Sequence, residues 1–220
     1  MNNRTTRKFR TGEAMAGFAA GLFEKALLKK NGRFTVALSG GRTPALLFKK
    51  LAALPLPWDR VVFFLADERC VPASSRQSNF GAVRRALFSK IKIPPANIHP
   101  PKTAASYERE LLSETAPSGR LDFVFLGLGA DGHTASIFRG SAAEKSEKLA
   151  LAITAPRGVK PEMRLTLTPK ALNRARAVVL MAAGPAKRKV FDLAARGDKK
   201  IPAGRLAPRG EFHLLYSEKE

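Results

Sequence analysis

The sequence has few of the residues from which disulfides and metal sites are built. Cys70 is its one cysteine, so no disulfide can form within the chain. The three histidines, His99, His133 and His213, lack the close spacing that is typical of metal ligands. We therefore expect no metal site, and the single thiol favours a reducing compartment.

Long apolar runs are also missing. No stretch of 18 consecutive apolar residues occurs, and the first residues lack the apolar segment of a signal peptide. We therefore expect no membrane partner and a cytoplasmic location. The oligomeric state is left open between a monomer and a small homo-oligomer.

Acidic residues are scarce relative to basic ones. With 18 Asp and Glu against 39 Lys and Arg, the formal net charge is +21. A surface of this sign attracts nucleic acids, acidic membranes and phosphorylated small molecules alike. The basic residues are spread along the whole chain, without a recognition helix or interleaved aromatic residues. We expect no specific nucleic-acid partner, although a non-catalytic polyanion-binding protein remains an alternative.

Short apolar runs alternate with helical patterns for most of the length. The runs at 34–38, 61–66, 121–126 and 177–183 are typical of strands buried on both faces, and amphipathic stretches at 13–30, 44–54, 78–90, 104–115 and 186–195 separate them. This alternation predicts a three-layer α/β/α fold, in which a mostly parallel, Rossmann-like sheet carries helices on both faces. Segments 149–154, 164–168 and 212–216 are candidates for further strands, antiparallel at an edge. We expect one domain over residues 1–220.

In such a sheet, ligands bind beyond the carboxyl ends of the strands, so the loops there are the first places to search. The loop after 34–38 has the residues of a tight turn into a helix, namely Ser39, Gly40, Gly41, Arg42, Thr43 and Pro44. Thr43 is a candidate helix cap, and the free N–H groups of a helix start beside Arg42 suit a phosphate. A bend with no ligand explains the glycines equally well.

Two other strand-end loops carry charge. Asp67, Glu68 and Arg69 follow the run at 61–66, where the carboxylates would orient Arg69 as an anion ligand or form a surface ion pair. Ser78 and Asn79 are candidate caps of the next helix. The glycine turn after 177–183 leads into Lys187, which would bind a phosphate or belong to a basic helix face.

The fourth loop, after 121–126, combines a glycine pattern with a histidine. Its G-x-G-x-x-G spacing is that of a dinucleotide-binding loop, but that motif needs an acidic residue about 20 positions later at the end of a strand. The candidate strand 149–154 ends in Thr154 instead, so the cofactor interpretation fails. Asp131 and His133 remain at the strand end, with the small residues 134–136 predicted to start a helix. A histidine there is suited to act as a general base, because its usual pKa is about 6.5.

Taken in order, these loops resemble the 6-phosphogluconolactonase family. The similar segments are "LSGGRTP", "DERCVP" followed by "SN", "GLGADGHTASIF", "RLTLT" and "GPAK", which together span residues 34–190. The resemblance implies hydrolysis of 6-phospho-D-glucono-1,5-lactone, the second step of the oxidative pentose phosphate pathway, without metal or cofactor.

The resemblance also implies roles for individual residues. His133 would activate water and Asp131 would orient the site, with Asp67 and Arg69 in the same catalytic group and Arg69 on the phosphate or the developing oxyanion. The substrate and its phosphate would be held by the loop after 34–38, by Arg164 and by Lys187. Within that loop the residues concerned are Ser39, Gly40, Gly41, Arg42 and Thr43.

Other functions remain possible alongside this one. The sister glucosamine-6-phosphate deaminases, sugar-phosphate isomerases of the same superfamily, share "SGG-x-TP" and "DGH" but resemble "DGHIAFNEP" where this chain has "DGHTASIF". A serine hydrolase built on Ser39 and His133 lacks the G-x-S-x-G elbow that exposes a nucleophile. The chain departs from the family at Gln77, where an acidic residue is common, at Arg139, where a proline is common, and in "EFHLLYSEKE", which lacks a Trp and an Asp.

Overall fold

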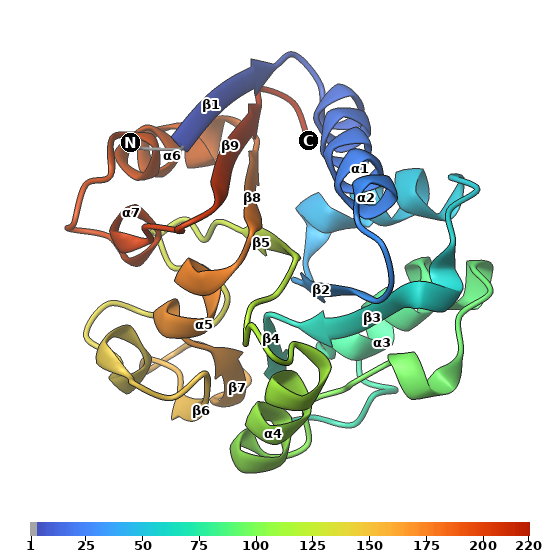
Figure 1. Cartoon of the computed structure of the whole chain (residues 1–220). Helices are drawn as coiled ribbons and strands as arrows, with labels where there is room; N and C mark the ends of the chain where they lie inside the picture. Colours follow the sequence, from blue (N-terminus) through green and yellow to red (C-terminus); the bar gives the residue numbers. More distant parts are fainter. Residues whose placement is uncertain (1–3) are drawn as a thin grey trace.

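Residues 4–220 are described by the computed structural model, in which strands and helices alternate along the chain (Figure 1). The strands are β1 (Arg4–Phe9), β2 (Phe34–Leu38), β3 (Val61–Leu65), β4 (Asp67–Arg69), β5 (Phe123–Gly127), β6 (Ala150–Thr154), β7 (Met163–Leu167), β8 (Ala177–Ala183) and β9 (Glu211–Ser217). The α-helices are α1 (Gly12–Lys29), α2 (Arg42–Ala52), α3 (Asn79–Ala86), α4 (Ala104–Glu114), α5 (Pro169–Arg174), α6 (Arg188–Arg196) and α7 (Pro202–Arg205). Short 3₁₀ turns lie at Trp58–Arg60, Phe88–Lys90, Pro95–Asn97, Ala142–Lys145 and Pro185–Lys187.

Six strands form one parallel sheet in the order β1-β9-β8-β5-β2-β3. The predicted mostly parallel sheet is therefore confirmed. The expectation of an antiparallel edge strand at 212–216 is wrong, because β9 runs parallel between β8 and β1. Residues 4–9, for which the sequence predicts no strand, form the edge. Their basic side chains suit an edge, where charge discourages pairing with another chain.

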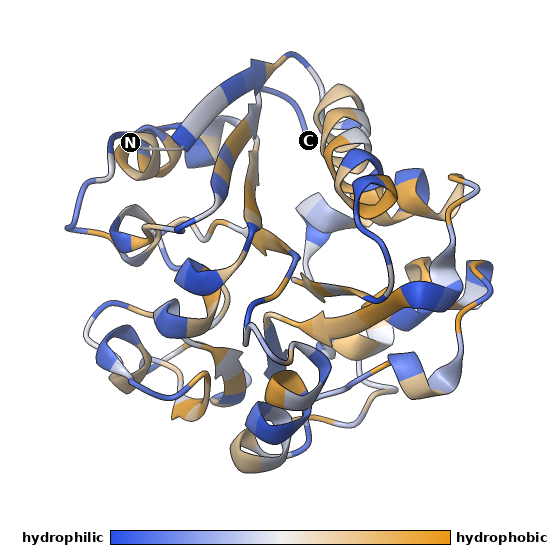
Figure 2. Cartoon of the chain, in the orientation of Figure 1, coloured by the Kyte–Doolittle hydropathy of each residue, from blue (hydrophilic) through white to orange (hydrophobic). Residues whose placement is uncertain are grey.

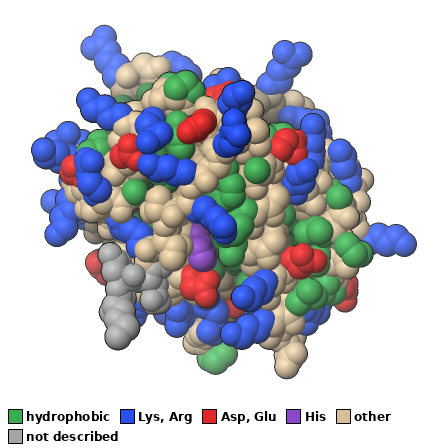
Figure 3. All heavy atoms as spheres, turned by 90° about the horizontal axis from the view of Figure 1, so that it is seen from above, with side chains coloured by type: hydrophobic (Ala, Val, Ile, Leu, Met, Phe, Trp, Pro, Cys, Tyr) green, Lys and Arg blue, Asp and Glu red, His purple; other side chains and the backbone are tan. Residues whose placement is uncertain are grey.

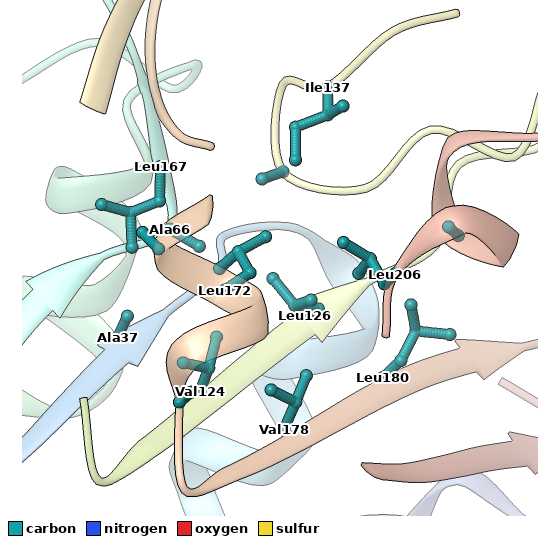
Figure 4. Close-up of a cluster of buried hydrophobic side chains, with 14 of the residues drawn as sticks. Ala37, Ala66, Val124, Leu126, Ile137, Leu167, Leu172, Val178, Leu180 and Leu206 are labelled. Carbon is teal, nitrogen blue, oxygen red and sulfur yellow. The ribbon is translucent and has the colours of Figure 1, made fainter. Parts of the chain in front are cut away.

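Helices cover both faces of this sheet, which confirms the three-layer α/β/α arrangement. Phe34, Phe63 and Phe125 point to the side where α1, α2 and α3 pack. The alternate residues, such as Val124 and Leu126, point to the other side, where α4 to α7 pack. Figure 2 shows mostly hydrophobic central strands, whereas the helices around them carry both hydrophobic and hydrophilic residues. In Figure 4, side chains from α5 and the α7 region cover β5 and β8.

A smaller antiparallel sheet of β4, β7 and β6 lies beyond the carboxyl end of β3. The predicted strands at 149–154 and 164–168 are thus confirmed as β6 and β7. Their expected place at the edge of the main sheet is wrong, because β7 pairs with β4 instead. Strand β4 was not predicted from the sequence, because its three residues, Asp, Glu and Arg, are all charged. This sheet forms one wall of the pocket described below.

Basic side chains lie at many separate places on the face seen in Figure 3, with Asp and Glu among them, rather than in one patch. No helix within residues 4–220 is long and apolar enough to cross a membrane.

Candidate active site

A pocket of about 250 Å³ opens at the carboxyl ends of the parallel strands. It is lined by Ser39, Gly40, Gly41, Arg42, Thr43, Pro44, Asp67, Arg69, Asn79, Gly127, Leu128, Gly129, His133, Ala135, Arg164 and Lys187. The loops after β2, β3, β5 and β8 therefore meet here, as the topology of a parallel sheet requires. Every site residue expected from the sequence lines this pocket except Asp131, which contacts His133 from the exposed side.

His133 and Asp131 form a hydrogen-bonded pair in the loop after β5. The imidazole Nδ1 lies 2.5 Å from Asp131 Oδ1, and the backbone N–H of His133 donates to the same oxygen at 3.1 Å. A proton on Nδ1 then faces the carboxylate, which leaves Nε2 as the acceptor. Partial burial raises the pKa of Asp131, but the hydrogen bonds and charge of His133 outweigh it, so that this pKa lies below its ordinary value. Asp131 can therefore stay ionised and hold the ring in one tautomer.

A glycine makes room for this pair. The backbone N–H of Gly129 donates to the carbonyl of His133 at 2.8 Å, which closes the loop on itself. A Cβ at position 129 would overlap His133 Nδ1 and Asp131 Oδ1. Gly129 of the G-x-G-x-x-G pattern thus allows the compact loop in which Asp131 contacts His133.

We expect Gly129→Ala to lower kcat by about tenfold or more, because the added methyl group displaces the base from its carboxylate partner. Gly127→Ala is the graded control, since a Cβ there meets no atom within 4 Å. The decrease in kcat of Gly127→Ala should be clearly smaller than that of Gly129→Ala. Equal kcat values for the two variants, at matched thermal stability, would contradict this account of the loop.

The helix predicted to start at residues 134–136 is absent from the described chain. Ala135 has a φ of 49°, in the left-handed region, and an isolated bridge joins Thr134 to Ile137. The hydroxyl of Thr134 donates to the carbonyl of Gly127 at 2.8 Å, and that of Ser136 donates to Asp67 at 2.6 Å. These polar side chains stabilise a tight turn, and a helix would break both contacts.

Two arginines lie side by side in the wall of the pocket. Arg69 in β4 is directly opposite Arg164 in β7, an arrangement of like charges that is unfavourable by itself. Burial lowers the pKa of Arg164 below its ordinary value, Arg69 lowers it further, and Asp67 opposes both. Arg164 also lies 5.5 Å from the ring centroid of Phe138, against which His133 packs at 4.6 Å. This cationic pair, close to the histidine, is suited to an anion.

Neither carboxylate of the "DER" segment pairs with the guanidinium of Arg69, contrary to the expectation from the sequence. Asp67 accepts hydrogen bonds from Ser136 and from Asn79, and Glu68 turns away toward α3. The guanidinium of Arg69 instead donates to the backbone carbonyl of Gln77 at 2.7 Å. Its buried Nε atom has no hydrogen-bond partner in residues 4–220. A donor in that state can be satisfied by a bound anion.

The loop after β2 presents the start of α2 to the pocket. Gly41, with a φ of 111°, is the residue before the helix, so Thr43 is not the cap that the sequence predicted. The first N–H groups of a helix have no acceptor within it, and they face outward here with Arg42 beside them. The buried hydroxyl of Ser39 lacks a hydrogen-bond partner within the described part of the chain. It therefore makes no bond to His133 there, which argues against a serine nucleophile.

Lys187 adds a further cation to the lining of the pocket. It ends the turn after β8, which Gly184 opens with a φ of 86°. Burial lowers the pKa of Lys187 below its ordinary value, and Arg42 adds to this, while Glu220 opposes it. Glu220 also lies 3.4 Å from Arg42. In residues 4–220, no three His, Cys, Asp or Glu side chains gather closely enough to hold a metal ion.

Two buried polar residues connect these loops: Asn79, which the sequence analysis named only as a candidate helix cap, and Ser136, which it did not single out. Asn79 donates to the backbone and side chain of Asp67, and Ser136, which is fully buried, links Asp67 to the Arg164 side of the pocket. Ser78, by contrast, caps α3 as expected. A buried serine between apolar neighbours in "ASIF" was the available signal for Ser136.

Comparison with known proteins defines the class first. The family model described as "Glucosamine-6-phosphate isomerases/6-phosphogluconolactonase" matches residues 10–214. The solved structure of a monomeric glucosamine-6-phosphate deaminase superposes with a TM-score of 0.83 at 17% identity, covering 97% of both chains, which shows a shared fold. The fold is therefore common to both branches of this class.

The 6-phosphogluconolactonases are much more similar in sequence. The chain is 40% identical to the 6-phosphogluconolactonase of Thermotoga maritima over 168 residues, 73% of this chain and 74% of that protein. A crystal structure of 6-phosphogluconolactonase from Thermotoga maritima superposes with a TM-score of 0.85 at 34% identity, covering 98% of this chain and 100% of the other. The chain belongs to the 6-phosphogluconolactonase family within this superfamily.

Proposed function

We propose that this protein hydrolyses 6-phospho-D-glucono-1,5-lactone to 6-phospho-D-gluconate, with His133 as the general base. The observation that carries the proposal is the Asp131–His133 pair at the edge of a pocket lined by Arg42, Arg69, Arg164 and Lys187. A base beside clustered cations suits an anionic substrate whose reacting group is attacked by water.

The first step forms the tetrahedral intermediate. Nε2 of His133 takes a proton from a water molecule as its oxygen bonds to the lactone carbonyl carbon. Asp131 accepts the Nδ1–H hydrogen bond and stabilises the imidazolium that results. Negative charge develops on the carbonyl oxygen, where a guanidinium of the arginine pair can stabilise it.

The second step opens the ring. The carbonyl re-forms, the bond between the carbonyl carbon and the ring oxygen breaks, and the imidazolium returns its proton to that oxygen. The products are a carboxylic acid, ionised at neutral pH, and a free hydroxyl group. A lactone is an activated acyl group, so positioning, one base and electrostatic stabilisation suffice.

The phosphate would be held by the start of α2, Arg164 and Lys187. The α2 start offers backbone N–H groups with Gly40 and Gly41 allowing close approach, and Ser39 adds a hydroxyl without a partner in residues 4–220. Arg69, next to Arg164, would contact either the phosphate or the oxyanion.

The decisive experiment follows the loss of 6-phosphogluconolactone against its spontaneous hydrolysis, with and without the protein. Acceleration that scales with protein concentration supports the proposal. Ammonia release from glucosamine 6-phosphate, without lactone hydrolysis, would assign the protein to the deaminase branch. Retention on a polyanion with neither activity would favour the polyanion-binding alternative.

The cationic lining makes a prediction about substrate choice. Unphosphorylated gluconolactone should show a kcat/KM lower by about 100-fold or more, since charge-assisted hydrogen bonds contribute about 1.5–3 kcal/mol each. Inorganic phosphate should compete with the phosphorylated substrate. Equal kcat/KM values for the two lactones would mean that the cations do not bind the phosphate.

A further inference from the structure

We infer that Glu68 is a positioning residue that holds together the anion-binding side of the pocket. It does not line that pocket, and it acts through Arg69, Asn79 and the loop before α2. The inference rests on the proposed function, because it assigns the positioned groups to substrate binding.

The pleat of β4 separates Glu68 from its neighbours. Successive side chains of a strand point to opposite faces, so Asp67 and Arg69 face the pocket while Glu68 faces the start of α3. Glu68 stands between two pocket residues in the sequence, but its side chain contacts the start of α3 instead of the pocket. Glu68 is 8% exposed, so its carboxylate depends on protein donors for its hydrogen bonds.

All four hydrogen bonds to this carboxylate come from the segments that it joins. Oε1 accepts from the backbone N–H of Arg69 at 2.7 Å and of Asn79 at 2.8 Å. Oε2 accepts from the hydroxyl of Ser78 at 3.0 Å and from the backbone N–H of Phe80 at 2.7 Å. One side chain thus fixes the first turn of α3 against β4.

The connection continues from α3 to the loop before α2 through Asn79. Its amide nitrogen donates to the carbonyl and to the carboxylate of Asp67, at 2.9 and 3.1 Å. Its side chain also lies directly against Gly40, where an added Cβ would overlap it. The position of Asn79, set by Glu68, therefore limits where the glycine turn before α2 can lie.

The catalytic base has no direct contact with Glu68. The loop of Asp131 and His133 closes on Gly129, and Thr134 ties it to Gly127. The route from Glu68 to this loop is indirect, through Asn79, Asp67 and Ser136. Loosening Glu68 should consequently weaken substrate binding more than the chemical step. A rise in KM with a smaller change in kcat is the signature that this arrangement predicts.

The test is Glu68→Gln, which puts an NH₂ group where one carboxylate oxygen now accepts two hydrogen bonds. We expect KM for 6-phosphogluconolactone to rise by about tenfold while kcat falls by less than about threefold, with the pH profile unchanged. An unchanged KM, or equal losses in kcat and kcat/KM, would overturn the inference.

Asp122→Asn is the matched control. Asp122 is a buried carboxylate that accepts from the backbone N–H and the hydroxyl of Thr35, at 2.8 and 3.0 Å, at the opposite end of the sheet. This variant should lower Tm while leaving KM unchanged. If it raised KM as Glu68→Gln does, the effect would be general destabilisation and the positioning role would be wrong.

Two further measurements keep the inference testable. Should Glu68→Gln fail to fold, Ser78→Ala, which removes one of the four hydrogen bonds together with the cap on the N–H of Gly81, should raise KM by a smaller factor at normal kcat. Stabilisation by inorganic phosphate, read as a rise in Tm, needs no turnover. It should be present in the wild type and in Asp122→Asn but reduced in both Glu68→Gln and Ser78→Ala.

A wild type without lactonase activity defeats the proposed function, whereas an active wild type with equal phosphate stabilisation in all variants defeats only the role of Glu68.

Discussion

Replacing His133 with alanine is expected to lower kcat for 6-phosphogluconolactone by about 100-fold or more without loss of the fold. The ring is the one imidazole among the residues that line the pocket, and its Nδ1 is already engaged by Asp131. Its Nε2 is thus the acceptor that water can reach. The measurement is the initial rate above spontaneous hydrolysis, together with Tm to confirm folding.

His213→Ala is the control for this substitution. That histidine contacts Thr5 and Glu211 near the start of β9 and does not line the pocket. Its removal should leave kcat unchanged. Turnover by His133→Ala close to that of the wild type would refute the assignment of the base, whereas parallel losses in both variants would indicate a general effect on folding.

The main sheet was predictable because local sequence patterns indicate most of its strands and the helices that cover it. The buried strands β2, β3, β5 and β8 are short apolar runs, and α1, α2 and α4 begin and end within two residues of the positions that amphipathic spacing predicts. The place of the pocket then follows from topology, since parallel strands bring their carboxyl ends together.

What the sequence did not predict depends on long-range partners. The strand β1 is rich in basic residues and forms because β9 lies beside it, more than 200 residues along the chain. The strand β4 consists of three charged residues that pair with β7. Ser136 meets Asp67 only once two loops have come together. Local propensity contains no information about such contacts.

The departures from the family pattern do not touch the central contacts. Arg69 is held by the backbone carbonyl of Gln77, so that contact does not depend on which side chain stands at position 77. Arg139 is exposed and lies outside the pocket lining. The C-terminal strand, which lacks the usual Trp, still forms β9 in full register with β8.

Replacing Lys187 with alanine is expected to raise KM for the phosphorylated lactone by about 10- to 100-fold, because each charge-assisted hydrogen bond contributes about 1.5–3 kcal/mol. The effect on unphosphorylated gluconolactone should be small, since that substrate offers the lysine no anion. The pKa of Lys187 lies below its ordinary value, so this contribution is lost at a lower pH than for an exposed lysine, as the pH rises through that lowered pKa. Measuring KM for both lactones against pH checks the assignment.

Neutralising lysines far from the pocket is the control for Lys187→Ala, because a net charge of +21 could steer an anion toward the pocket from a distance. The distal lysines Lys29, Lys199 and Lys200 do not line the pocket, whereas Lys30 is left in place because it pairs with the buried Asp122 at 2.6 Å. Screening at 0.15 M salt acts over about 8 Å, so steering by distal charge should fade with salt while contact with Lys187 should persist. We expect neutralisation of the distal set to change kcat/KM by less than about threefold, and only at low salt. A large loss from the distal set, with Lys187→Ala nearly silent, would mean that the phosphate is bound elsewhere.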